Sequence, residues 1–549
     1  MNRFPCVRLR IAKTDRLEDR PRVKGRSRVS LQHHLVRIGL LMSAVAVLLI
    51  WLASRTEVMF ADGLRYVAQA QAIDQGSWSE AVARAVDHPA YPVSIAAVHR
   101  LSGGNSPIAW QAAAQAASVI AGVLLVVPLY LFALELYGTP AAWLACLLTF
   151  LVPLTGHVLA DVLAEGTFLL FWMTGCWTAL RFLRDGRTVW LVATIVFAGL
   201  AYMTRPEGLL LPLALAGTLG LMVCRPASRF SWPVWRRAVL LLIAGPLLVA
   251  GPFVALKGGI ATKPAVARLL GLAARSPAMA VERERPLDPD QSTLTTYVVA
   301  GRAAARAVLG AVSSPLLVLA IVSLFAAGGN THRGRKGLFL ALILIGWLLA
   351  LVRLHVTGGY CTPRHALIFA LPVIAAAAQG LNFLVDRCTA RFLTGANAHR
   401  RALLSGALIG ICLVAGTVLY GRDLIAPINP GFRGYRQAGE WLAAHSPRDA
   451  RVLDLKGWAT FYGERAGYTF EDLRQAEHDP GLSWIVAHDA LLIGPWYYCA
   501  ALRRVVGDRS PVKSFPAERR PGIAQVHIFE VSGKLARTGS TPAPDSRRQ

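Results

Sequence analysis

The chain has 549 residues, of which 54% are hydrophobic and 16% are charged, and its formal net charge is +26. A soluble domain has no use for so much apolar surface, because its core is filled long before. The composition therefore excludes an ordinary soluble protein and predicts a polytopic α-helical membrane protein, with many apolar stretches near the roughly 20 residues that span a bilayer.

The first 35 residues form a basic segment without a long apolar run. Lys and Arg collect in the cytoplasmic tails and loops of membrane proteins, so we expect a disordered tail on the cytoplasmic side. The same rule accounts for the net charge, and we expect no nucleic-acid partner. The apolar run 36–53 follows a charged segment too long for a signal peptide and is expected to stay as the first membrane helix.

About eleven apolar segments are candidates for membrane helices, and together they define a predicted transmembrane domain at 36–420. They are 36–53, 107–135, 140–158, 164–183, 188–203, 207–224, 238–256, 303–327, 338–353, 365–385 and 402–420. Four of the five loops on one side are basic, whereas the loops on the other side carry nearly all the loop acids. The positive-inside rule therefore predicts a multi-pass protein of the inner (plasma) membrane, with a cytoplasmic N-terminus and an extracytoplasmic C-terminus.

Two segments outside the membrane are long enough to fold, and both are predicted to be extracytoplasmic. The loop 54–106 has room for two amphipathic helices lying on the membrane. Residues 421–535 alternate helical and strand patterns and predict a small α/β domain. The loop 257–302 is expected to be mobile, and the tail 536–549 to be disordered.

The eight cysteines form no CxxC pair, and four of them lie within apolar runs. There they are expected to act as small apolar side chains rather than as disulfides or zinc ligands. We therefore predict no metal site and no required cofactor, although the acidic residues described below leave room for a divalent metal.

The segment FADGLRYV, directly after the first apolar run, places Asp62, Arg65 and Tyr66 at positions i, i+3 and i+4. On a helix these three residues share one face. One reading is a helix start at the membrane interface, with Arg and Tyr among the headgroups. The other is a functional acid and base one helical turn apart.

A second acidic pair, Asp161 and Glu165, lies between the third and fourth apolar segments. Like charges at this spacing repel, so a cation or a raised pKa should accompany them. Ionisable groups so close to hydrocarbon usually serve a purpose. The alternative is two acids that point into water at a helix end.

Three further clusters fall on the same predicted side of the membrane. In MTRPEG, Arg205 and Glu207 flank a proline that ends one helix and starts the next. The two interpretations of this pair are a structural salt bridge at a turn and part of a binding site. The other two clusters are Tyr360, Arg364 and His365 in GGYCTPRHA, and His88 and Tyr91 in DHPAYP. Because the spans themselves contain almost no charges, these residues favour an interfacial active site over an ion pathway through the membrane.

This arrangement resembles the GT-C glycosyltransferases, specifically the bacterial protein O-mannosyltransferases and aminoarabinose transferases. The residues that carry the resemblance are D-x-x-R-Y after the first span, a second acid between spans three and four, the TRPEG turn, the Arg-His pair at 364–365 and a C-terminal domain opened by GEWL and RVLD. Relatives often have a second acid beside the first, where this chain has Gly63, and the aminoarabinose enzymes have a Lys before a Pro, where this chain has His88.

The resemblance implies an inverting transfer of sugar from a polyprenyl phosphate at the extracytoplasmic membrane face. Asp62 would take the proton from the acceptor hydroxyl. Arg65, with Arg205 or Arg364, would stabilise the departing lipid phosphate, and Asp161 and Glu165 would orient the acceptor or hold the arginines. The remaining residues of the clusters, Tyr66, His88, Tyr91, Glu207, Tyr360 and His365, would complete the donor site.

Two other functions fit the same composition. A transporter or flippase of lipid-linked sugars would have inverted repeats and a charged cavity at mid-membrane, and the sequence has no clear internal repeat. A membrane scaffold that binds a partner through its C-terminal domain would tolerate the loss of Asp62. The expected partners are the sugar donor and membrane lipids, and neither the sugar nor the acceptor (a lipid, a glycan or a protein) is specified by the sequence.

Overall fold

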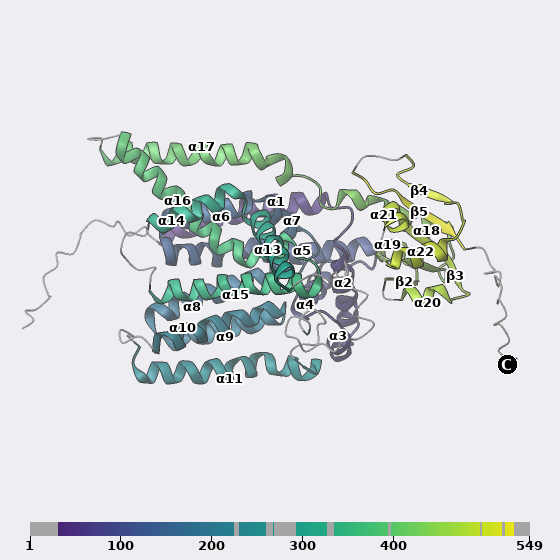
Figure 1. Cartoon of the computed structure of the whole chain (residues 1–549), viewed down its shortest axis with the longest axis horizontal. Helices are drawn as coiled ribbons and strands as arrows, with labels where there is room; N and C mark the ends of the chain where they lie inside the picture. The colour runs from purple at the N-terminus through teal and green to yellow at the C-terminus, as the bar shows by residue number, and fades with distance from the viewer. Residues whose placement is uncertain are drawn as a thin grey trace, which may run out of the picture.

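The computed structural model describes residues 31–223, 230–259, 267, 293–326, 334–392, 397–470, 472–494, 497–518 and 522–531. Most of the predicted basic tail, most of the loop 257–302 and the whole tail 536–549 lie outside these residues. The described chain is a bundle of helices with a small sheet at one end (Figure 1).

Seven helical segments of the described chain are long and apolar enough to cross a membrane. They are α1 (Leu31–Ser54), α5 (Pro107–Tyr137), η1 with α10 (Pro206–Leu209, Leu210–Val223), α11 (Trp232–Lys257), α15 (Arg335–Gly358), η3 with α16 (Pro363–Ala366, Leu367–Phe392) and α17 (Ala398–Leu424). Two bent pairs raise the number to nine if each pair is one span. The helical membrane architecture is confirmed, whereas the count of eleven spans is not.

The bent pairs replace two spans that the sequence predicts as continuous. α6 (Thr139–Leu151) and α7 (Pro153–Ala160) meet at 74°, and α13 (Thr293–Val312) and α14 (Ser314–Ala326) meet at 92°. Pro153 begins α7, and a proline cannot continue the hydrogen-bond ladder of the preceding helix. At the second bend, Ser313 adopts a left-handed conformation with φ of 68°.

Two further predicted spans form helices that do not meet the same criterion. α9 (Thr188–Tyr202) has 15 residues, and at about 1.5 Å per residue such a helix is too short for a 30 Å bilayer core. α8 (Glu165–Asp185) packs against both α5 and α9 and is largely buried. A helix surrounded by protein can carry polar side chains such as Thr178, whose hydroxyl bonds within the bundle.

The loop after α1 folds into three helices, where the sequence predicts two. They are α2 (Ala61–Asp74), α3 (Trp78–Arg84) and α4 (Ala90–Ser102). Gly76, with φ of 89°, turns the chain between α2 and α3, a conformation that other residues rarely adopt. All three helices lie at the end of the bundle that faces the sheet (Figure 1).

The residues after α17, 425–531, form what we call the C-terminal unit. Its helices are α18 (Arg433–His445), α19 (Trp458–Gly463), α20 (Leu473–Glu477), α21 (Asp489–Ile493) and α22 (Tyr497–Val506), preceded by the short η4 (Pro430–Phe432). The strands β1 (Arg451–Asp454), β2 (Gly467–Tyr468), β3 (Leu482–His488), β4 (Lys513–Phe515) and β5 (Val526–Glu530) form one sheet in the order β2-β1-β3-β5-β4. The alternation of helices and strands that the sequence predicts here is confirmed within the described residues, whereas the boundaries 421–535 stay a prediction.

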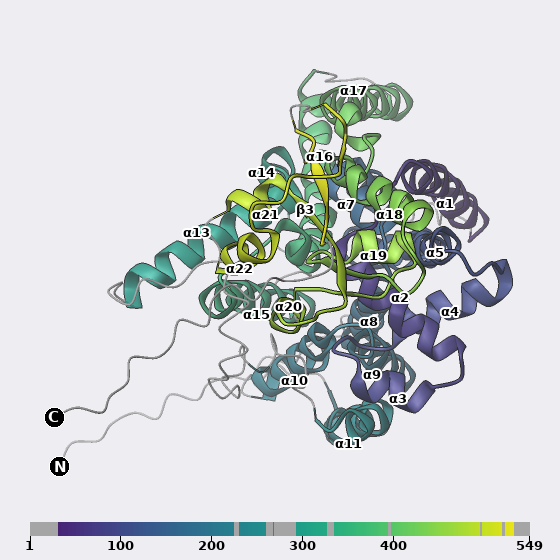
Figure 2. The same ribbon diagram turned by 90° about the vertical axis from the view of Figure 1, so that its right-hand side faces the viewer.

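The central strand β3 is buried on both faces. It pairs in parallel with β1 and antiparallel with β5. Trp484 and Val486 pack with α18 and α19, whereas Ile485 and Ala487 pack with α20 and α22. The first of these two cores also contains Val58, from the segment that joins α1 to α2, so the C-terminal unit is packed onto the first loop. α19 contacts both α2 and α5, and the three helices lie next to one another in Figure 2.

Candidate active site

The first turn of α2 supplies an acid and a base. Arg65 Nη2 donates to Asp62 Oδ1 at 3.3 Å, as the one-turn spacing predicts. The helix begins at Ala61 because Phe60 is still extended, with ψ of 147°. Asp62 and Arg65 are therefore held on one face, directly after the segment that leaves α1.

A second guanidinium contacts Asp62 from a residue 302 positions further along the sequence. Arg364 lies in η3, after Pro363, and its Nη2 donates to Asp62 Oδ2 at 2.8 Å. The guanidinium carbon lies 4.5 Å from the centre of the Phe60 ring, within the range of a cation–π contact. The two oxygens of Asp62 are thus divided between Arg65 and Arg364.

Arg205 connects two more acids to this pair. It follows α9 in an extended conformation, with its Nη1 2.6 Å from Glu165 Oε1 and its Nη2 2.8 Å from Glu207 Oε1. Glu165 Oε1 also lies 4.0 Å from Arg364 Nε. This contact joins the charged residues around Arg205 to those around Asp62. The pairing of Arg205 with Glu207 across Pro206 agrees with the sequence, and the cation expected beside Glu165 is Arg205.

Asp87 also belongs to this group of charged residues, although it is not among the site residues predicted from the sequence. Its Oδ2 accepts a hydrogen bond of 2.8 Å from Arg65 Nε, and the residue is 2% exposed. It directly precedes His88-Pro89 in the quoted DHPAYP stretch, so an acid beside a rigid turn was the available signal. We call the seven residues Asp62, Arg65, Asp87, Glu165, Arg205, Glu207 and Arg364 the ionic network.

Opposite charges within the network shift the pKa values of Asp62, Arg65 and Arg205 toward the charged forms. Burial alone would raise the pKa of Asp62, but Arg364 and Arg65 outweigh it and lower that pKa below its usual 3.8. Burial opposes the charge of Arg65 and Arg205, and the neighbouring carboxylates, Asp87 for the first and Glu207 and Glu165 for the second, raise both pKa values nonetheless. Asp62 is consequently an ionised carboxylate at neutral pH.

Arg364 Nη1, a donor, and Glu165 Oε2, an acceptor, are buried atoms of the network that have no hydrogen-bond partner among the described residues. A buried guanidinium N–H without an acceptor is costly and is suited to an anionic oxygen such as that of a phosphate.

The acids of the network are bonded to arginines rather than gathered around a shared point. Among the described residues, no group of three or more His, Cys, Asp or Glu side chains is placed to hold a metal ion. The expectation of a reaction without a required cofactor stays a prediction.

Asp161 lies outside the ionic network, which corrects the expectation that it could hold the arginines. Its Oδ1 accepts hydrogen bonds from the backbone N–H groups of Val162 (2.7 Å) and Phe60 (3.1 Å), and its Oδ2 accepts one from Asn429 Nδ2 (2.9 Å). A break between α7 and α8 separates Asp161 from Glu165. Burial raises the pKa of Asp161 to about 6, whereas the neighbouring charge of Glu165, from which the sequence predicted a raised pKa, is only a minor cause.

The two predicted tyrosines of the first loop are buried beside the network. Tyr66 meets Tyr91 edge to face, with ring centres 5.2 Å apart. The Tyr91 hydroxyl donates to Ala114 O and contacts Ser118 Oγ, so it anchors α4 to α5. Burial raises the pKa of Tyr66, and both phenols are neutral supports of α2.

The two predicted histidines and Tyr360 shape the turns around the arginines. His88 is buried, with Nδ1 2.5 Å from Tyr202 O, and it packs between α9 and α11. His365 Nδ1 contacts the Thr362 hydroxyl at 2.9 Å in a capping box that starts η3. The Tyr360 ring lies 5.8 Å from the His365 ring. The structure thus gives these three residues contacts that support the turns.

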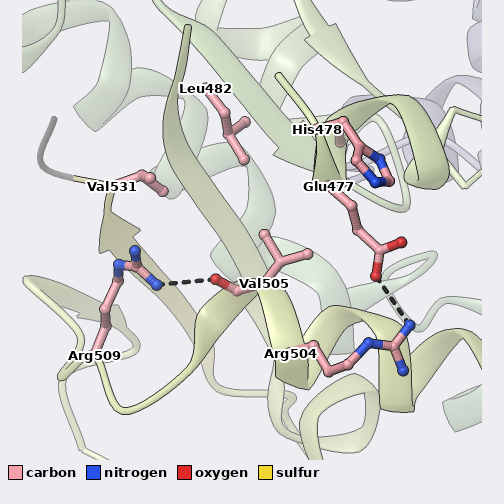
Figure 3. Close-up of a pocket in the computed structure, with 8 residues that line it drawn as sticks. Glu477, His478, Leu482, Arg504, Val505, Arg509 and Val531 are labelled. Atoms are coloured by element: carbon pink, nitrogen blue, oxygen red, sulfur yellow. Dashed lines mark hydrogen bonds and ion pairs between the residues drawn. The ribbon is translucent and has the colours of Figure 1, made fainter. Parts of the chain in front are cut away.

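A separate pocket lies in the C-terminal unit (Figure 3). Its lining includes Leu482 and Val531, together with Glu477, which pairs with Arg504 at 3.0 Å. It contains none of the residues predicted for the site, and we assign it no part in the chemistry.

Comparison with known proteins adds a family and a fold. Residues 87–253 match the family model of dolichyl-phosphate-mannose-protein mannosyltransferases. Among curated proteins, none matches the chain significantly in sequence.

Two solved structures share the arrangement of the chain. ArnT from Cupriavidus metallidurans, bound to undecaprenyl phosphate, is 14% identical with a TM-score of 0.55, over 91% of this chain and 98% of that one. The oligosaccharyltransferase AglB from Archaeoglobus fulgidus, in complex with an inhibitory peptide and a dolichol-phosphate, is 13% identical with a TM-score of 0.57, over 86% of this chain and 71% of that one.

The chain has the GT-C fold. The resemblance that the sequence suggested is thereby confirmed at the level of the fold. The family match covers Asp87, Glu165, Arg205 and Glu207, whereas Asp62, Arg65 and Arg364 lie outside it. The GT-C bundle brings these two sets together at one end.

Proposed function

We propose that this GT-C protein is an inverting glycosyltransferase that takes its sugar from a polyprenyl phosphate at the extracytoplasmic face of the membrane. The acceptor is a hydroxyl of a lipid, a glycan or a protein. The observation that carries the proposal is an ionised carboxylate, Asp62, held between guanidiniums from two distant elements, Arg65 and Arg364.

In the proposed reaction Asp62 is the general base. An acceptor oxygen attacks the anomeric carbon from the face opposite the phosphate, and its proton passes to Asp62. The bond between the anomeric carbon and the phosphate oxygen breaks, and the electron pair leaves with the lipid phosphate. The configuration at the anomeric carbon is therefore inverted.

The arginines stabilise the leaving phosphate. Among the described residues, Arg364 has a buried N–H without a partner, and a phosphate oxygen is the acceptor that it suits. When the phosphate shares the guanidiniums of Arg364 and Arg65, their hold on Asp62 weakens, and the pKa of its carboxyl rises toward that of a better base. Asp87 bonds Arg65, and Glu165 lies 4.0 Å from Arg364, so both arginines stay in place.

The nature of the donor is supported by the relatives and by the physics of the interface. The two structures compared above were solved with a polyprenyl phosphate, one with undecaprenyl phosphate and one with a dolichol-phosphate. An isoprenoid tail stays in the bilayer at roughly 0.8 kcal/mol per buried CH₂, while its phosphate remains among the headgroups. A network of arginines at the end of a helical bundle suits such a ligand.

The test is sugar transfer by the purified full-length protein in lipid nanodiscs. We would add a panel of polyprenyl-phosphate sugars with acceptor extracts and follow the loss of donor and the release of polyprenyl phosphate by mass spectrometry. We expect turnover by the wild type and a loss of at least about 10³-fold in Asp62→Asn.

Asp74→Asn is the matched control. Asp74 lies on the same helix, has the same 23% side-chain exposure as Asp62 and pairs with Arg100 at 2.7 Å, so its loss should leave turnover unchanged. Normal turnover in Asp62→Asn would exclude it as the base. Movement of intact donor between leaflets without release of polyprenyl phosphate would favour the flippase instead.

A further inference from the structure

Residues 56–60, five of the six residues between α1 and α2, have backbone groups that are bonded mostly by side chains rather than by secondary structure. Gln111 donates to the carbonyl of Thr56 at 3.1 Å, and Asp161 accepts from the N–H of Phe60 at 3.1 Å. Buried backbone groups need such partners, so each of these contacts fixes the path of the chain toward Asp62. We call residues 56–60 the lead-in segment.

Most of the remaining contacts of the lead-in segment come from the C-terminal unit. Trp458 Nε1 donates to Met59 O at 3.0 Å, and the Tyr462 hydroxyl accepts from Met59 N at 3.2 Å. The same hydroxyl donates to Gln111 Oε1 at 2.6 Å, which connects the C-terminal unit to α5. These two side chains of α19 therefore bond both the carbonyl and the N–H of Met59.

Asn429 makes the contact that connects all the parts. Its Nδ2 donates to Val58 O at 3.2 Å and to Asp161 Oδ2 at 2.9 Å. It adopts a left-handed conformation, with φ of 51°, which Asn tolerates better than most residues. One amide group thus joins the C-terminal unit to the lead-in segment and to the break between α7 and α8.

The position of Asp62 follows from that of the lead-in segment. Phe60 O accepts from Gly63 N at 2.8 Å in the first turn of α2, so Asp62 lies within that hydrogen-bonded turn. The ring of Phe60 lies under Arg364, the guanidinium that bonds Asp62. A shift of Val58 or Met59 would therefore move Asp62 relative to Arg364.

We propose that the C-terminal unit positions the general base, and that Asn429 is a positioning residue that acts on Asp62 through the lead-in segment. The proposal deepens the proposed function and rests on it in so far as Asp62 is the base. Asn429 itself touches neither Asp62 nor any arginine of the ionic network in the contacts described above.

The first test is hydrogen–deuterium exchange of the full-length protein without substrate. Asn429→Gly removes the amide but keeps the left-handed backbone, because glycine adopts it without strain. We expect faster exchange of the peptide that contains Met59 and Phe60, with the exchange of α5 and α15 unchanged. Glu477→Gln is the control, because it breaks an ion pair in the same unit at the separate pocket of Figure 3.

The second test is the division of the kinetic effect between kcat and KM. A misplaced base slows the chemical step but leaves donor binding intact, so Asn429→Gly should lower kcat on the order of 10- to 100-fold, with little change in the KM of the donor. A general loss of structure would instead lower the amount of folded protein and its melting temperature in parallel with activity.

A charge exchange sharpens the second test. Asn429→Asp places a carboxylate opposite Asp161, and the repulsion should reduce kcat further than Asn429→Gly does. The double variant Asn429→Asp/Asp161→Asn restores a donor and an acceptor across this contact, and kcat should recover above that of Asn429→Asp. No recovery, or unchanged exchange of Met59 and Phe60 in Asn429→Gly, would overturn the proposal.

The two tests separate the failure of this inference from that of the proposed function. A wild type that transfers no sugar overturns the proposed function, while the exchange experiment still decides whether Asn429 holds the lead-in segment. Faster exchange with unchanged kcat would show that the contact has a structural role only and would overturn the positioning role.

Discussion

At the scale of single residues, Arg364 differs from the other arginines of the ionic network. Arg65 and Arg205 each donate hydrogen bonds to two carboxylates, whereas Arg364 donates to Asp62, lies 4.0 Å from Glu165 and keeps a buried N–H without a partner among the described residues. A planar guanidinium can donate to Asp62 from one nitrogen and to a phosphate from another, in a fixed geometry that the compact ammonium group of a lysine does not reproduce. Replacing Arg364 by lysine keeps the positive charge but changes the hydrogen-bond geometry, so an experiment can measure the two contributions separately.

We expect Arg364→Lys to lower kcat/KM for the donor by about 10²-fold, and Arg364→Ala by about 10³-fold, because a stabilising donor at the leaving phosphate is lost. Steady-state rates at varied donor concentration would measure this. Arg100→Lys is the control, since Arg100 is exposed and pairs only with Asp74 among the acids of the described chain. Equal kcat/KM for Arg364→Lys and the wild type would remove Arg364 from the phosphate site.

The two acids Asp62 and Asp161 should respond to pH in opposite ways. The pKa of Asp62 is lowered, so Asp62 stays ionised from pH 5 to 8 and its protonation should not limit the rate there. The pKa of Asp161 is raised to about 6, so folding favours its protonated form. Its contribution to stability is present below the unfolded pKa of 3.8 and is lost as the pH rises through about 6.

A shift of about two pKa units corresponds to about 3 kcal/mol. We therefore expect the melting temperature of the wild type to fall between pH 4 and 7, and Asp161→Asn to remove part of this dependence. Asp454, whose pKa burial also raises to about 6, accounts for a further part. Equal pH dependence in the wild type and Asp161→Asn would contradict the assignment.

At the scale of elements, the contact between α2 and the α7–α8 break determines which residue can follow Asp62. A Cβ atom added to Gly63 would lie 2.9 Å from Val162 Cβ and from Met59 Sδ. The glycine at this position therefore fits a close contact that a larger side chain would crowd.

Gly63→Ala should accordingly lower the stability by about 1–3 kcal/mol, as overpacking does, and should reduce turnover because α2 carries Asp62. Thermal unfolding and turnover of the same preparation would test this. Gly39→Ala in α1 is the control, because an added Cβ meets nothing within 4 Å there and alanine favours a helix. A Gly63→Ala variant as stable as the wild type would show that the contact adapts.

The elements also show which structural predictions could succeed. The strands and helices of the C-terminal unit were predictable because their periodicity is local. The bend at α13–α14 was not, because an apolar run has the same composition whether it is straight or bent. Pro153 was the available signal for the bend at α6–α7, but a proline alone does not decide it, since Pro128 lies inside the continuous helix α5. Similarly, α8 can carry polar side chains because other helices surround it, and its own residues do not show that they do.

At the scale of the whole molecule, α2 to α4 and the C-terminal unit lie at one end of the bundle (Figure 1). The ionic network belongs to the same end, because its ion pairs join α2 to the start of α8, to η1 and to η3. The positive-inside rule predicts that this end is extracytoplasmic. The opposite end carries basic residues such as Arg184 and Lys336, which surround the buried Glu135. The same rule therefore predicts an extracytoplasmic position for the end with the ionic network and a cytoplasmic position for the end with Arg184 and Lys336.

We expect a membrane-impermeant maleimide to label Arg84→Cys in intact cells and Arg187→Cys only after the membrane is opened. Arg84 is 81% exposed at the end of α3, and Arg187 is exposed directly before α9. The unchanged chain, with its own cysteines, measures the background. Labelling of Arg187→Cys first would invert the topology and move the proposed reaction to the cytoplasmic face.

The sequence by itself determined the class of protein, the positions of most helices and strands and nearly all members of the ionic network. These features follow from local composition, periodicity and charge, which a single chain displays directly. Only the tertiary structure decided that Glu165 joins the arginines while Asp161 turns away to hold Phe60, and that Asp87 belongs with Arg65. These choices depend on distances between segments far apart in the chain, and such distances exist only once the bundle and the C-terminal unit have packed together.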